Sequence, residues 1–170
     1  FNVLNVNDAP VINESLAQVR FTFFDGNYYT VVAGPTWADA QAQSVELGGS
    51  LVSINSAEES QFLIDSFKDV NLGHADLLSF DQDVYWIGLT KESGQWQWSD
   101  GTDLSYQQWG PNEPYEDSGL DDRGEVVLDF GEGWAATPGN WNNSTSDFNL
   151  RFGIAEIVTG TVPFGPIAIQ

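Results

Sequence analysis

The chain has 170 residues, with 25 Asp and Glu against 5 Lys and Arg, which gives a formal net charge of −20. A protein this acidic is repelled by nucleic acid and by anionic lipid, so we expect no nucleic-acid partner. It has no cysteine, which excludes a disulfide scaffold and a thiolate zinc site. Its apolar runs are too short to span a bilayer, so we expect no membrane insertion.

Residues 1–19 do not look like the start of a folded domain. The stretch FNVLNV alternates apolar and polar residues as a strand does, and NDAP then ends it with a turn former and a proline. This resembles the V-N-D-A-P joints between β-sandwich modules of large bacterial surface proteins. Because the chain opens with Phe1 and has no Met, we expect a piece excised from a longer, repeat-containing polypeptide. On this view residues 1–19 end the preceding repeat and its linker, 20–158 form the domain, and 159–170 are a tail or linker.

The pattern of elements becomes clear after residue 20. RFTFFDGNYYTVV predicts a hairpin around the turn DGN. PTWADAQAQSVELGG predicts a helix that Thr36 caps and the glycine pair ends, and SAEESQFLIDSF predicts a second helix with a capping box of Ser56 and Glu59. VYWIGLT is nearly all apolar, as a buried central strand is. Short strands within long polar loops follow, so the order indicates an α+β fold with a mostly irregular second half.

The loop between residues 109 and 125 is crowded with acidic side chains. Arg123 is the only basic residue in this segment. The acidic residues are Glu113, Glu116, Asp117, Asp121, Asp122 and Glu125. Like charges this close repel one another, so the loop is either well solvated or neutralised by a cation. Carboxylate and amide oxygens suit Ca²⁺, whereas a chain with one His and no Cys provides poorly for zinc. Both readings, a solvated acidic loop and a Ca²⁺ site, remain open at this point.

A series of short motifs in the same region resembles one known family. The motifs YWIGL, WQWSDGT, WGPNEP, EVVLDF, GNWNN and GIAEI follow one another in the order found in C-type lectin-like domains. The resemblance covers about residues 21–157. It implies an α+β C-type lectin-like fold with two helices flanking short antiparallel sheets and a long Ca²⁺-binding loop region. Most animal members carry cysteines that are absent here, so the chain resembles the cysteine-free bacterial type.

The resemblance also implies a Ca²⁺ site, with two departures from the family pattern. Glu113 and Pro114 match the start of the family's E-P-N triplet, whose proline follows a cis peptide bond, and Tyr115 stands where Asn would be. Asn143 stands where the family's W-N-D strand has Asp, although Asp147 could take that place instead. The metal ligands implied in this way are Glu113, Tyr115, Asp121, Asn142 and Asn143.

Two further sets of residues are candidates in this loop region. A second ion could be held by Glu116, Asp117 and Asp122. A sugar would be bound by Glu113, Tyr115, Asp121, Trp134 and Asn142. Trp134 lies in a glycine-flanked loop, where it serves either as a stacking platform for a sugar ring or as a buried side chain, and the other tryptophans of the region are expected in the core.

These observations predict a calcium-dependent carbohydrate-binding module. We expect a monomeric module of a bacterial adhesin, at the cell surface or secreted, that recognises the vicinal hydroxyls of fucose- or mannose-type sugars on cell-surface glycans. The alternative is a protein- or peptide-binding adhesin domain with only structural calcium, and the fold also hosts ice binding. An enzyme is not expected, because acids around a cation have lowered pKa values and no Ser-His-Asp set is apparent.

Overall fold

The computed structural model describes residues 21–68, 82–116, 122–130, 137–145 and 152–158. The described elements are, in chain order, β1 (Thr22–Phe24), β2 (Asn27–Val32), α1 (Trp37–Glu46), β3 (Ser50–Leu51), α2 (Ala57–Phe67), β4 (Gln82–Glu92), β5 (Gln95–Trp98), β6 (Arg123–Phe130), β7 (Trp141–Ser144) and β8 (Phe152–Val158). The expected hairpin, both helices and the central strand are confirmed. Residues 1–19 and 159–170, predicted to be linkers, lie outside the described residues.

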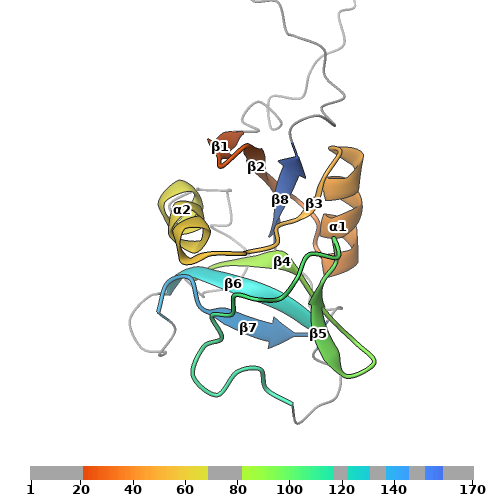
Figure 1. Ribbon diagram of the computed structural model, residues 1–170, viewed down its shortest axis with the longest axis vertical. Helices are drawn as coiled ribbons and strands as arrows, with labels where there is room; N and C mark the ends of the chain where they lie inside the picture. Colours follow the sequence, from red (N-terminus) through yellow and green to blue (C-terminus); the bar gives the residue numbers. More distant parts are fainter. Residues whose placement is uncertain (1–20, 69–81, 117–121, 131–136, 146–151, 159–170) are drawn as a thin grey trace, which may run out of the picture.

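The described strands form one sheet with the order β1-β2-β8-β4-β6-β7. In addition, β3 pairs with β8 and β5 pairs with β4. All pairs are antiparallel except β4 with β8, which is parallel. The α+β class is therefore confirmed, but the strands join into one mixed sheet where separate antiparallel sheets were expected. Figure 1 shows α1 and α2 on opposite sides of the β2–β8 pair, with β4, β6 and β7 continuing the sheet away from them.

The first hairpin forms because its turn residues accept a left-handed backbone. Asp25 and Gly26 have φ angles of 42° and 91°, and both values suit a tight turn between twisted strands. The hairpin then aligns β2 along β8, where Asn27 lies opposite Val158. The second and the last described strands are therefore neighbours, and β1 lies at the edge of the sheet beside β2.

Both helices begin at the predicted caps. The Thr36 side chain accepts a hydrogen bond from the backbone N–H of Asp39 at 3.1 Å, and Ser56 accepts one from that of Glu59 at 3.1 Å. The second half of the capping box differs from the prediction. The Glu59 carboxylate accepts from the backbone N–H of Asn55, one residue before the cap, at 2.8 Å.

Strand β4 is buried on both faces, which explains its nearly continuous apolar sequence. Tyr85, Ile87 and Leu89 belong to the core between the sheet and α2. Trp86 belongs to the smaller core under α1 and is fully buried. Alternate side chains of one strand thus join the two halves of the core.

Edge-to-face contacts between tryptophans hold the loop that follows β5 against the sheet. The ring centroids are 5.1 Å apart for Trp96 and Trp109, 5.8 Å for Trp109 and Trp141, and 5.2 Å for Trp98 and Trp141. Such edge-to-face contacts stabilise a segment beyond the area that they bury. The loop is therefore packed on the core although its backbone is irregular, and β5 to β8 give the second half more strand than its sequence indicated.

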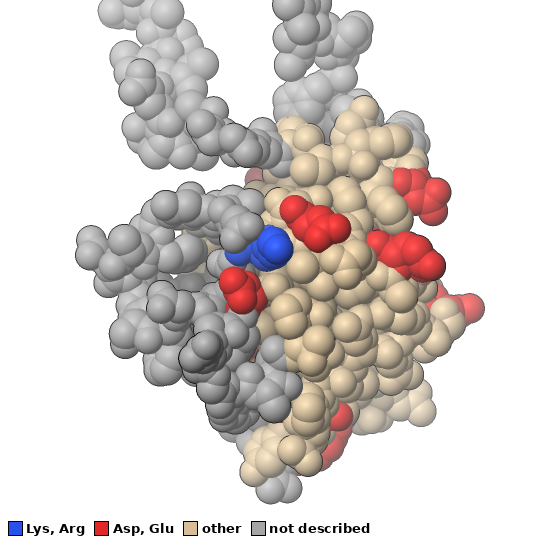
Figure 2. All heavy atoms as spheres, turned by 90° about the vertical axis from the view of Figure 1, so that its left-hand side faces the viewer, with Lys and Arg blue, Asp and Glu red and all other residues tan. Residues whose placement is uncertain are grey.

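The acidic side chains are spread over the described surface, as Figure 2 shows for the face on the α2 side. Much of the net charge is therefore solvated rather than gathered in one place. Neither described helix is long and apolar enough to cross a membrane.

Candidate functional site

The acidic loop is attached to strand β7 by backbone hydrogen bonds. The Trp141 N–H donates to the Gln108 carbonyl at 2.7 Å, and the Gly110 N–H donates to the Trp141 carbonyl at 2.8 Å. The Glu113 N–H then donates back to the Gly110 carbonyl at 3.0 Å, which turns the chain. The Glu113–Pro114 bond that follows is cis, as the family resemblance implied.

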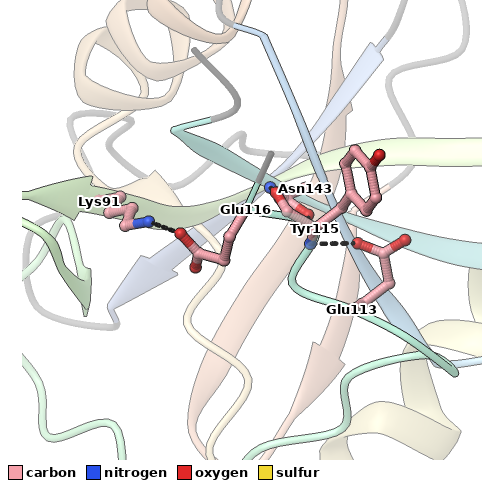
Figure 3. Close-up of polar contacts among 5 residues, drawn as sticks. All are labelled: Lys91, Glu113, Tyr115, Glu116 and Asn143. Atoms are coloured by element: carbon pink, nitrogen blue, oxygen red, sulfur yellow. Dashed lines mark hydrogen bonds and ion pairs between the residues drawn. The ribbon is translucent and has the colours of Figure 1, made fainter. Parts of the chain in front are cut away.

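The Tyr115 backbone lies between the side chains of Asn143 and Glu113 (Figure 3). Its N–H donates to Asn143 Oδ1 at 2.7 Å and also to Glu113 Oε2 at 3.0 Å. Its carbonyl accepts from Asn143 Nδ2 at 2.8 Å. We call the two bonds between Asn143 and Tyr115 the latch. It gives the Asn143 amide a positioning role, and its expected role as an ion ligand stays a prediction.

Asn142, the neighbour of Asn143 on β7, points to a different partner. Its Nδ2 donates to Glu125 Oε1 at 2.8 Å, because Glu125 lies opposite it on β6. This bond uses the amide nitrogen of Asn142 and not its oxygen. The role of Glu125 was missed, although its place at the head of the apolar run EVVL is a signal for a buried strand residue, and Glu125 is only 1% exposed.

Two of the three acids expected to hold a second ion, Glu116 and Asp122, have basic partners from the chain itself. Lys91 of β4 forms an ion pair with Glu116, which lowers the pKa of that exposed carboxyl through the hydrogen bond and the positive charge (Figure 3). Asp122 lies 3.2 Å from Arg123, whose guanidinium stacks on Trp37 at 4.8 Å. Sequence reasoning missed Lys91, because no local signal joins it to a loop 25 residues away.

The described part of the loop provides some of the oxygen donors that a calcium ion requires. The Glu113 carboxylate and the Asn142 amide oxygen are hard donors that suit Ca²⁺. Within the described ranges, no three His, Cys, Asp or Glu side chains gather as a metal cluster. The remaining candidates lie outside the described residues: Asp117, Asp121, Trp134 and Asp147. The donor chemistry of Glu113 and Asn142 therefore suits calcium, while the ion itself and Asp121 as one of its ligands stay predictions.

A pair of carboxylates, the buried Glu59 of α2 and the partly buried Glu156 of β8, lies away from the loop. The Tyr29 hydroxyl donates to Glu59 Oε1 at 2.8 Å and lies 3.3 Å from Glu156 Oε1. The Asn27 side chain donates to the same Glu156 oxygen at 2.7 Å. These contacts tie α2 to β2 and β8.

Burial changes the proton affinity of this pair. It raises the pKa of the Glu59 carboxyl, and it raises the pKa of Glu156 to about 7, with the neighbouring charge of Glu59 adding to the effect. Burial and both carboxylates also raise the pKa of Tyr29. The cluster therefore tends to retain a proton, in contrast to Glu116 in the loop.

Comparisons with known proteins agree with this architecture. The model of the Lectin C-type domain matches residues 34–152. Human asialoglycoprotein receptor 2 is 31% identical over 131 residues, which are 73% of this chain and 34% of that receptor. The chain thus spans about a third of the receptor's length.

Solved structures share the fold. A calcium-independent type II antifreeze protein has a TM-score of 0.60 at 25% identity, over 81% of this chain and 91% of its own. The carbohydrate-recognition domain of cow CD23 was solved in the presence of a GlcNAc2Man3 oligosaccharide. It has a TM-score of 0.62 at 24% identity, and the match covers 82% of this chain and 93% of the CD23 chain. With the family model matching most of the chain, we conclude that this protein belongs to the C-type lectin domain family.

Proposed function

We propose that this domain binds carbohydrate through the 113–116 loop and the neighbouring strand β7. The observation that carries the proposal is the arrangement around the Tyr115 N–H, which fixes the Glu113 carboxylate in a surface loop beside β7. A fixed carboxylate is a good acceptor for sugar hydroxyls. Tyr115 is 54% exposed, and its ring provides an aromatic face for the C–H groups of a sugar.

The proposal includes a calcium ion held by Glu113, Asp121 and Asn142. When bound, the ion supplies a positive centre to which the oxygens of two adjacent sugar hydroxyls are attracted. Glu113 and Asn142 then also exchange hydrogen bonds with those hydroxyls. Tyr115 and Asn143 support the loop in this arrangement through the latch.

The sugar class follows from the family resemblance of the loop. Glu113 followed by Pro114 resembles members that prefer mannose or fucose, so we propose vicinal hydroxyls of that type on cell-surface glycans as the ligand. A monosaccharide in such a shallow site buries little surface, and we expect a dissociation constant on the order of 1 mM.

The wider setting is also part of the proposal. The V-N-D-A-P joint near the start of the chain supports an extracellular, monomeric module of a bacterial adhesin, at the cell surface or secreted. Many copies of a weak site, presented together, give strong attachment without new contacts.

A glycan array tests the proposal, first with Ca²⁺ and then with EDTA. We expect binding to mannose- or fucose-bearing glycans that EDTA abolishes, and loss of binding in Glu113→Gln. Glu46→Gln, the same change at an exposed residue of α1, is the matched control and should bind normally. Sugar binding that survives EDTA would refute the calcium requirement, and no sugar binding under any condition would refute the proposal.

A protein- or peptide-binding module with only structural calcium is the second candidate. The fold alone does not imply a calcium-bound sugar, because a calcium-independent antifreeze protein shares it at 25% identity. An inactive glycan array, together with a calcium-dependent melting temperature, would support this alternative.

A further inference from the structure

The latch gives Asn143 a function that the expected set of ion ligands does not contain. We propose that Asn143 is a positioning residue, which holds the 113–116 loop in its binding shape without the help of a metal ion. The latch itself involves only described residues. Its use in ligand binding rests on the function proposed above.

The first argument is the hydrogen-bonding capacity of the side chain at position 143. An amide has a donor and an acceptor, and the Tyr115 backbone presents the complementary pair. The two bonds of 2.7 and 2.8 Å therefore close a ring between the side chain and the backbone. A carboxylate only accepts, so an Asp here could bind the N–H but would turn its second oxygen toward the Tyr115 carbonyl. Asn143 is 8% exposed, which leaves little room for water to replace the lost bond.

The second argument is that the latch also orients Glu113. The Tyr115 N–H that donates to Asn143 Oδ1 donates to Glu113 Oε2 as well. By fixing the direction of this N–H, Asn143 influences where the Glu113 carboxylate lies. Asn143 thus acts through the Tyr115 backbone rather than by direct contact with a ligand.

The third argument is the position of the latch along the loop. The loop is attached to β7 at Gly110, whose N–H donates to the Trp141 carbonyl, and the chain then continues away from β7 through Pro111 and Asn112. The latch attaches it to β7 a second time, two residues beyond Trp141, and β7 itself is paired with Gly124 of β6. A loop tied at both ends to a paired strand keeps its shape through its own hydrogen bonds.

This arrangement separates loop order from ion binding. In the natural chain, removing a divalent cation should weaken ligand binding but leave the Tyr115 amide hydrogen-bonded. In Asn143→Asp, a second carboxylate would lie beside Glu113, and the loop would close fully only when a cation offsets the added charge.

The test is hydrogen exchange of the Tyr115 backbone amide in the full chain, followed by NMR in EDTA and in CaCl₂. We expect the natural protein to exchange at the same rate, within about twofold, in both solutions. Asn143→Asp should exchange about tenfold faster in EDTA, which is the effect expected for the loss of about one hydrogen bond, and CaCl₂ should restore most of the protection. Asn112→Asp is the matched control: it makes the same chemical change at an exposed residue of the same loop, whose φ of 65° Asp also accepts.

Three results would overturn the inference. Tenfold faster exchange of the natural protein on chelation would show that the ion orders the loop. An Asn143→Asp protein as protected as the natural one in EDTA would show that the latch is dispensable. Fast exchange of that variant in both solutions would show simple structural damage. If the variant does not fold, the exchange rates of the natural protein in EDTA and in CaCl₂ still decide whether the ion orders the loop. A protected Tyr115 amide without any sugar binding would leave this inference standing while refuting the proposed function.

Discussion

Glu59 of α2 is buried and Glu156 of β8 is partly buried, and burial raises the pKa of both carboxyls. Glu116, in contrast, lies in an open loop, where Lys91 lowers its pKa. The chemical group is the same in both regions. The buried pair is held by a hydroxyl and by amides and serves the fold, while the loop acid remains charged and faces solvent. Acidic composition alone therefore does not identify a functional site, and the surroundings of each carboxylate do.

The largest expected effect is the loss of a carboxylate from the buried region. Glu59→Ala would remove the nearer acceptor of the Tyr29 hydroxyl and the acceptor of the Asn55 N–H, and should lower the free energy of unfolding by about 3 kcal/mol. Urea unfolding measures this change. Glu58→Ala, at the exposed neighbouring position of the same helix, is the control. Equal losses in the two variants would break the contrast between buried and exposed acids.

Calcium should act on the loop and not on the buried pair. If the ion binds only the folded state, then at ~100 times its dissociation constant it adds about 2.7 kcal/mol to the free energy of unfolding. The melting temperature of chelated protein should rise on adding CaCl₂, and Glu113→Gln should reduce that rise while Glu156→Gln should not. An unchanged melting temperature would argue against a loop ion.

The buried region should also show its own dependence on pH. The pKa of Glu156 is about 7 in the folded protein, above its ordinary value of 4.5, so the folded state holds this proton more tightly than the unfolded state. The contribution of this proton to stability is present in full when the pH lies below the pKa of Glu156 in the unfolded state, and it disappears as the pH rises through about 7. From about pH 5 to about pH 8 the loss should be on the order of 2 kcal/mol.

Glu156→Gln isolates this contribution, because the amide keeps the shape and cannot titrate. We expect the variant's unfolding free energy to fall less with pH than that of the natural protein. Parallel pH profiles for the two proteins would contradict the assignment of the proton to Glu156.

The smallest effect is expected at the exposed ion pair. Lys91→Gln should raise the pKa of Glu116 toward its ordinary value, because the hydrogen bond and the positive charge are lost. NMR titration of the Glu116 carboxyl measures the change, and the melting temperature should barely move, since surface pairs contribute little. A pKa that stays low in the variant would point to a different cause. Lys68→Gln on the end of α2 serves as the control.

Local signals in the sequence account for much of the fold. Thr36 and Ser56 are recognisable as caps because each helix needs acceptors at its first turn, and VYWIGLT identifies β4 because a strand covered on both faces has no polar side. The motif around Glu113 and Pro114 located the loop and its cis bond.

The pairings between distant residues could not be predicted in the same way. The bond from Asn142 joins residues 17 positions apart, that from Lys91 spans 25, and that between Tyr29 and Glu156 spans 127. Such contacts depend on strand order and register, which no local pattern specifies. The latch is of this kind, since Tyr115 and Asn143 are 28 positions apart.

The pairing of β2 with β8 has a consequence for mechanical load. The described domain begins with β1, where Thr22 lies opposite Tyr29 of β2, and it ends with β8, where Glu156 lies opposite the same Tyr29. A pull on both ends therefore acts across the β1–β2 and β2–β8 hydrogen bonds. The loop after β5 lies at the other end of the molecule (Figure 1). Tension applied to the two ends would therefore strain β1, β2 and β8 before it reached the loop that carries Glu113.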